Sequence, residues 1–89
     1  MTQQQIYDDL KVLAEQMGLV VRMEMGDFDG GICVLKERKV ILLNRRHDIA
    51  RRINVIARSL HRIGLGDVFV KPALRELIDD EVARAGTAQ

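Results

Sequence analysis

The sequence contains few aromatic residues, one cysteine and one proline, and each scarcity excludes a class of protein. Phe, Tyr and Trp together make up 3 % of the 89 residues. A single cysteine cannot form a bridge within the chain, which excludes a disulfide-stabilised scaffold and favours a reducing compartment. No apolar run approaches the roughly 18 residues of a membrane span, and the polar N-terminus lacks the features of a signal peptide. We therefore expect a cytoplasmic protein with no membrane partner.

The composition that remains is typical of a folded domain. The chain is 47 % hydrophobic and 30 % charged, which lies inside the range of globular proteins. A chain of this length supports one modest hydrophobic core. We expect one domain over residues 1–89, with an ordered core at about residues 3–84.

Hydrophobic periodicity predicts an α+β fold. A capping box of Thr2 and Gln5 opens a helix that ends near Met17, and Asp48 is a plausible N-cap of the most regular helix. Alternating or β-branched segments separated by turn formers predict strands. The expected elements, in order, are a helix at 3–17, strands at 19–25, 32–35 and 40–43, a helix at 49–63 and a helix from Pro72. Short links between the strands predict a three-stranded antiparallel meander.

The second and third predicted strands are apolar on both faces. Helices on one side of the sheet would leave the other face open, so either the last helix wraps round or a second copy covers that face. This predicts a homodimer. The alternative is an ordinary monomer in which a few apolar side chains are exposed, as is common on protein surfaces.

Charge is unevenly distributed along the chain. Residues 32–62 hold nine basic residues against two acidic ones, a balance of +7, although the whole chain carries only +1. At about 100° per residue, Arg51, Arg58 and Arg62 fall within roughly 40° of one another, opposite the apolar stripe of their helix. Arg45 and Arg46 lie just upstream. The alternative is an ordinary solvated face.

This basic helix predicts a non-catalytic protein-interaction domain whose partner is an acidic protein or a phosphate-bearing ligand. A weak nucleic-acid-binding module is less favoured, because no aromatic residues lie among the basic ones and the pI is about 7.9.

Cys33 follows Gly30 and Gly31 at the start of a strand, where a thiol could be exposed. The alternative function is therefore a small thiol-dependent enzyme or redox sensor. Apolar neighbours predict instead that Cys33 is buried and slow to react. The two histidines and one cysteine lack the spacing of zinc ligands, so no metal or other cofactor is expected, and no catalytic motif is recognisable.

Four segments of the chain resemble a family of short bacterial proteins of unknown function. Members share a GGxC strand opening, an LN pair before the main helix and a PAxRE-like start to the last helix. The matching segments here are Gly30–Lys36, Leu43–Arg46, Ile56–Leu60 and Val70–Glu76. The resemblance spans about Ile6 to Ile78 and implies no particular activity.

The order of elements also resembles, more distantly, the minimal core of zinc-dependent metallopeptidases. In that core a helix bearing HExxH supplies two histidine ligands and a glutamate base. The matching stretch here is Arg58-Ser59-Leu60-His61-Arg62, with arginine at both ligand positions and serine at the base position. The resemblance therefore implies a domain that has lost its metal and its chemistry.

Overall fold

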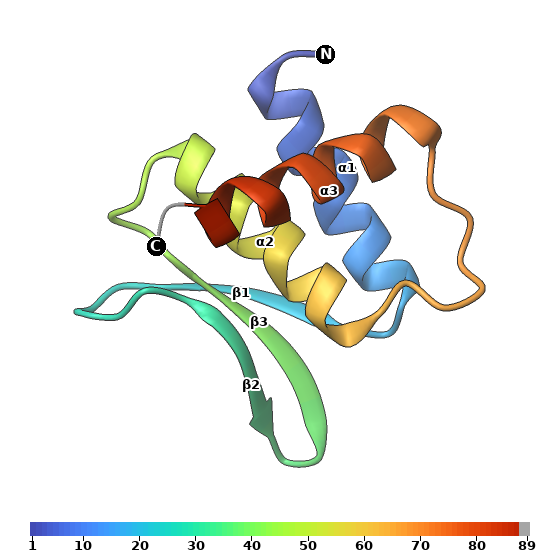
Figure 1. Ribbon diagram of the computed structural model, residues 1–89. Helices are drawn as coiled ribbons and strands as arrows, with labels where there is room; N and C mark the ends of the chain where they lie inside the picture. The colour runs from blue at the N-terminus through green and yellow to red at the C-terminus, as the bar shows by residue number, and fades with distance from the viewer. Residues whose placement is uncertain (88–89) are drawn as a thin grey trace.

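The computed structural model describes residues 1–87, and the side chains of residues 1–84. The elements are α1 (Gln3–Gln16), β1 (Val20–Glu24), β2 (Gly31–Leu35), β3 (Arg38–Asn44), α2 (Ile49–Ile63) and α3 (Pro72–Thr87). The predicted α+β class, with one helix before the sheet and two after it, is confirmed (Figure 1). No helix in the described part of the chain has the length and apolar character needed to cross a membrane.

The sheet is mixed, so the predicted antiparallel meander is wrong. Its strand order is β1-β3-β2. β2 pairs antiparallel with β3, as a hairpin requires, whereas β1 pairs parallel with β3 and does not neighbour β2. The physical reason lies in β3, whose Val40, Ile41 and Leu43 are at most 3 % exposed. The central position lets β3 pair along both edges while these three side chains are buried, and it leaves an outer edge to β1, which carries Arg22 and Glu24.

The β2–β3 hairpin turns on two residues, Lys36 and Glu37, so β3 begins at Arg38, two residues earlier than predicted. Both turn residues have positive φ, 50° and 69°. This is the backbone of a type I′ turn, which Asn-Gly usually occupies and which matches the twist of the strands. Lys36-Glu37 is not an Asn-Gly sequence, so the pairing of β2 with β3 imposes this turn geometry.

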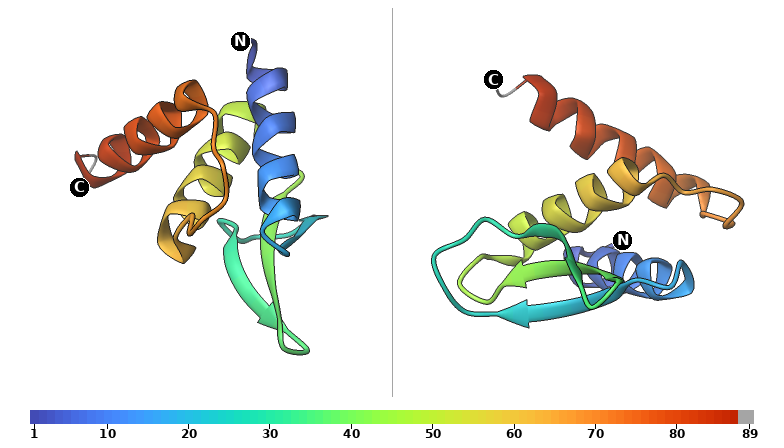
Figure 2. Two further views of the ribbon diagram at one scale, coloured as in Figure 1. Left: turned by 90° about the vertical axis from the view of Figure 1, so that its right-hand side faces the viewer. Right: turned by 90° about the horizontal axis from the view of Figure 1, so that it is seen from below.

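The helices form two layers on one side of the sheet. α1 and α2 lie against the sheet, and α3 lies on the far side of α2 (Figures 1 and 2). The core between them holds six large side chains that are essentially inaccessible: Leu10, Ile41, Leu43, Ile56, Leu60 and Ile78. α2 is the central helix, since it contacts α1, α3 and the sheet.

Within residues 1–87, no helix covers the other face of the sheet, and α3 does not wrap round to it (Figure 2). Strand alternation and register place Val40 and Cys33 on this face, together with Leu35. Val40 is buried there all the same, at the centre of the sheet between Val20 and Cys33. The expectation that β2 is covered on both faces is wrong within the chain, since Val34 is 64 % and Leu35 45 % exposed. The homodimer stays a prediction.

Candidate functional site

An open groove of about 660 Å³ lies between α2, the later part of α3 and the segment that enters β2. Arginines and acidic residues share its lining with smaller polar and apolar side chains. The charged members are Asp29, Asp48, Arg51, Arg58, Arg62, Glu81 and Arg84. The groove is therefore a polar surface of mixed charge with an excess of arginine.

The local structure of α2 brings Arg51, Arg58 and Arg62 into this groove. The Asp48 side chain caps the helix, with its Oδ1 accepting a hydrogen bond from the Arg51 backbone N at 2.9 Å. Residues spaced by seven and four along a helix lie on one face. The opposite face holds Ile53 and Leu60, which are buried. The arrangement of the three arginines is thus the one that their spacing predicts.

Arg45 and Arg46, also expected to contribute to the basic surface, do not line the groove. They follow β3, where the Arg46 guanidinium forms an ion pair with Asp27 at 3.2 Å. The backbone oxygen of Arg45 accepts a hydrogen bond from Arg52 at 2.9 Å. Both residues follow the end of β3, at the end of the sheet where β2 begins, but outside the groove.

Some charges of the groove are already paired. Arg51 Nη2 lies 3.1 Å from Asp29 Oδ1, which links α2 to the segment before β2. Between the two helices, Asn54 Nδ2 of α2 donates to Glu81 Oε2 of α3 at 3.0 Å. Within α3, Arg84 Nη1 lies 3.4 Å from Glu81 Oε1. The polar contact between α2 and α3 is thus formed by the Asn54 amide and the Glu81 carboxylate. Two arginines of α2 that line the groove take no part in it.

Those two arginines are Arg58 and Arg62. Within the residues that the structure describes, neither side chain has an ion pair or a hydrogen bond. Both are exposed and line the groove. A guanidinium without a protein partner keeps all five of its N–H donors available for a ligand.

The β2 wall of the groove depends on a glycine. Gly30 has a φ of +86°, and a Cβ at this position would lie 2.7 Å from the Leu42 backbone oxygen. Only glycine satisfies both conditions without strain. The wall is therefore formed by main chain that packs closely against β3.

Asn44 fixes the link that leads to this wall. Its side chain is 3 % exposed. Its Nδ2 donates to the backbone oxygens of Gly26 and Phe28, each at 2.8 Å, and its Oδ1 accepts from the Arg46 backbone N at 3.0 Å. A buried amide with three partners holds the chain between β1 and β2 in place.

The structure separates the residues of the possible thiol site. Gly30 and Gly31 line the groove, and Cys33 does not. Cys33 pairs with Val40 across the hairpin, so its side chain lies on the open face of the sheet, whereas Ile32 faces the groove. Cys33 is partly exposed, which corrects the prediction that it is buried. The reason is that β2 is an edge strand with one uncovered face.

Among the described residues, no group of three or more His, Cys, Asp or Glu side chains is placed to hold a metal ion. The distant metallopeptidase likeness would locate such a site at Arg58 and Arg62, and those residues carry guanidinium groups that repel a cation.

Several lining residues were not singled out from the sequence. Asp29, Asn54 and Ser59 reach the groove with Glu81 and Arg84 because segments more than fifty residues apart meet there. Ser59 is itself satisfied, since its hydroxyl donates to the Val55 backbone oxygen at 2.7 Å. Helical spacing could have placed Asn54 near the arginines, but no local signal indicates that α3 lies against them.

Comparison of the chain with protein-family models, with curated proteins and with solved structures finds no match. The likenesses noted from residues and element order stay predictions.

Proposed function

We propose that this chain is a non-catalytic interaction domain that binds an acidic segment of a partner protein in the groove between α2 and α3. The observation that carries the proposal is the pair Arg58 and Arg62, exposed, adjacent on α2 and without partners in the described structure. Arginine binds carboxylates through two parallel hydrogen bonds, which supplies geometric specificity as well as charge.

The spacing of the two arginines suits a peptide. Residues four apart on a helix are displaced by about 6 Å along its axis. In an extended peptide, side chains two residues apart point the same way and lie about 6.6 Å apart. A segment of the type Glu-x-Glu could therefore present one carboxylate to Arg58 and the next to Arg62.

The acidic residues of the groove favour such a peptide over a continuous polyanion. Asp29, Asp48 and Glu81 line the same surface, and a nucleic acid lying along it would bring phosphates close to these carboxylates. A peptide can alternate carboxylates with neutral or basic side chains and so match the mixed charge. The shortage of aromatic residues also leaves no platform on which bases could stack.

Binding of fluorescein-labelled peptides, measured by fluorescence anisotropy, tests the proposal. A peptide with repeated Glu-x-Glu should bind, and its Gln-x-Gln counterpart should not. Replacing Arg58→Gln together with Arg62→Gln should weaken binding at least about tenfold, since hydrogen bonds to charged groups contribute roughly 1.5–3 kcal/mol each. The matched control is Arg38→Gln with Arg75→Gln, which removes two exposed arginines outside the groove.

Equal binding by the double variant and its control would show that the groove is not the site. Competition by inorganic phosphate at concentrations well below those of sodium chloride would favour a phosphate-bearing ligand over a carboxylate one. Binding should also weaken as salt rises, because exposed charges are screened.

The partial exposure of Cys33 supports a second candidate, a thiol-dependent function. Labelling of the native protein with a thiol reagent at neutral pH tests it. A rate far above that of a free cysteine would favour this function, whereas an ordinary or slower rate would count against it.

A further inference from the structure

The two edges of the sheet differ in how they are protected. β1 carries Arg22 and Glu24, which form an ion pair at 2.6 Å. β2 has the sequence Gly-Ile-Cys-Val-Leu, with no charge and no proline, and in the described structure it pairs on one side only, with β3. Natural edge strands usually carry charges, prolines or bulges that prevent pairing with another chain. The β2 edge lacks these devices, and its Val34 and Leu35 are exposed.

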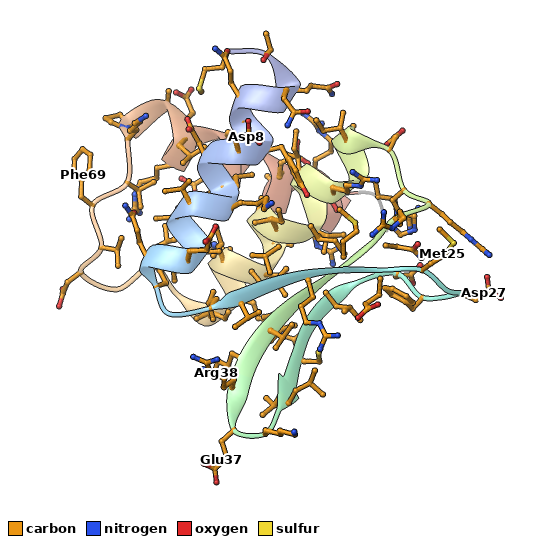
Figure 3. The ribbon with its side chains drawn as sticks, turned by 180° about the vertical axis from the view of Figure 1, so that it is seen from behind. Asp8, Met25, Asp27, Glu37, Arg38 and Phe69 are labelled. Atoms are coloured by element: carbon orange, nitrogen blue, oxygen red, sulfur yellow. The ribbon has the colours of Figure 1, made fainter. Side chains whose placement is uncertain are left out.

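Opposite charges flank β2. The link before it holds Asp27 and Asp29, whereas the hairpin after it holds Lys36, Arg38 and Lys39 against Glu37. Figure 3 shows Asp27 at one end of the sheet and Glu37 and Arg38 at the other. When two copies of such a strand pair antiparallel, the acidic flank of each lies beside the basic flank of the other. This edge is therefore complementary to itself in charge as well as in backbone hydrogen bonding.

The acidic flank remains accessible to a second chain. Asp27 pairs with Arg46 and Asp29 with Arg51, yet the aspartate side chains are 100 % and 92 % exposed. Exposed ion pairs of this kind contribute little to stability, so a second cation can approach the same carboxylates.

We propose that a second copy of the chain pairs with β2 antiparallel, joining the two three-stranded sheets into one continuous sheet. The strand runs from Gly31 to Leu35, so a two-fold axis at its centre places Cys33 opposite Cys33 of the second copy. Val34 then lies beside Ile32 of the second copy, and its exposed surface is covered. This proposal does not rest on the proposed peptide binding, although Gly31 and Ile32 belong both to the paired strand and to the groove wall.

The test measures mass by light scattering during size exclusion. The native chain should be a dimer at high micromolar concentration. Val34→Lys introduces a charge on the edge and should weaken dimerisation at least tenfold. The matched control, Val12→Lys, changes another exposed valine, 52 % accessible on α1, and should leave the dimer unchanged. Circular dichroism should show that both variants are folded.

Charge reversal tests the same contact without altering the apolar strand. Lys36→Asp should weaken the dimer and Glu37→Lys should strengthen it, because an axis at Cys33 places Glu37 opposite Asp29 of the second copy and Lys36 one position away.

Mild oxidation of the native chain should produce a dimer linked through Cys33, the only cysteine. Directly opposed residues in antiparallel strands have Cα separations that a disulfide accepts. The cross-link should form faster in the native protein than in urea. A monomeric native chain, a dimer that persists unchanged in Val34→Lys and in Lys36→Asp, or cross-linking no faster than in urea would overturn the proposal.

Discussion

The two faces of α2 perform different tasks. On the inner face, Ile53, Ile56, Ala57 and Leu60 are 0–4 % exposed and form the centre of the core. On the outer face, Arg58 and Arg62 are exposed and, within the described residues, have no partner. Burying a large aliphatic side chain contributes about 1.5–3 kcal/mol, whereas an exposed charge contributes little. One helix thus supplies stability on one side and an available surface on the other, and the two should respond independently to substitution.

The largest effect is expected on the inner face, from Leu60→Ala. Leu60 is fully buried where α2 meets the core. Removing its side chain should lower the free energy of unfolding by about 2–5 kcal/mol, the sum of lost burial and a cavity. Urea denaturation followed by circular dichroism measures this loss. A loss below about 1 kcal/mol would mean that the two faces do not differ in the way proposed.

A smaller loss is expected where the groove meets the sheet, from Gly30→Ala. The added Cβ would clash with the Leu42 backbone oxygen, and the φ of +86° is unfavourable for alanine. Strain of this kind costs about 1–3 kcal/mol. The control is Gly31→Ala, whose Cβ would meet nothing within 4 Å, although its φ of +136° still carries a backbone cost. Gly30→Ala should be the more destabilising of the two in urea melts.

The cap of α2 should contribute less again. Asp48→Ala removes the acceptor for the Arg51 backbone N–H, and losing such a cap costs typically about 1 kcal/mol. Asp48→Asn, which retains the acceptor oxygen, is the control and should restore most of the stability. If the two variants were equally destabilised, the charge of Asp48 in the groove, rather than its capping bond, would be the important property.

The smallest effect on stability is expected from reversing the outer arginines. Arg58→Glu with Arg62→Glu should change the free energy of unfolding by less than about 0.5 kcal/mol, while abolishing binding of the acidic peptide. Arg51→Glu should be somewhat more destabilising, because it replaces the ion pair with Asp29 by a repulsion. Thermal melts of the double variant, of Arg51→Glu and of the native chain, together with anisotropy titrations of the acidic peptide, test this comparison. A large fall in melting temperature for the Arg58 and Arg62 pair would indicate a structural role for that face.

Sequence patterns specified the local elements well. α2 begins and ends where Asp48 and Gly64 predict, and the Thr2–Gln5 capping box of α1 is present. These features depend on hydrogen bonds and side-chain periodicity within a few residues, so they can be read from a short stretch of chain. The placing of Arg51, Arg58 and Arg62 on one face has the same local origin.

Tertiary structure alone decided the sheet order and the walls of the groove. β3 lies between β1 and β2, and its Val40, Ile41 and Leu43 are more fully buried than the residues of either other strand. Which strand takes the central position depends on how distant segments pack together, and the alternation within one strand does not reveal it. The sequence likewise does not show whether carboxylates of α3 neutralise Arg58 and Arg62, because this depends on which α3 carboxylate reaches α2. Glu81 contacts Asn54 instead, since packing of the apolar Leu74 and Ile78 into the core sets how α3 lies against α2.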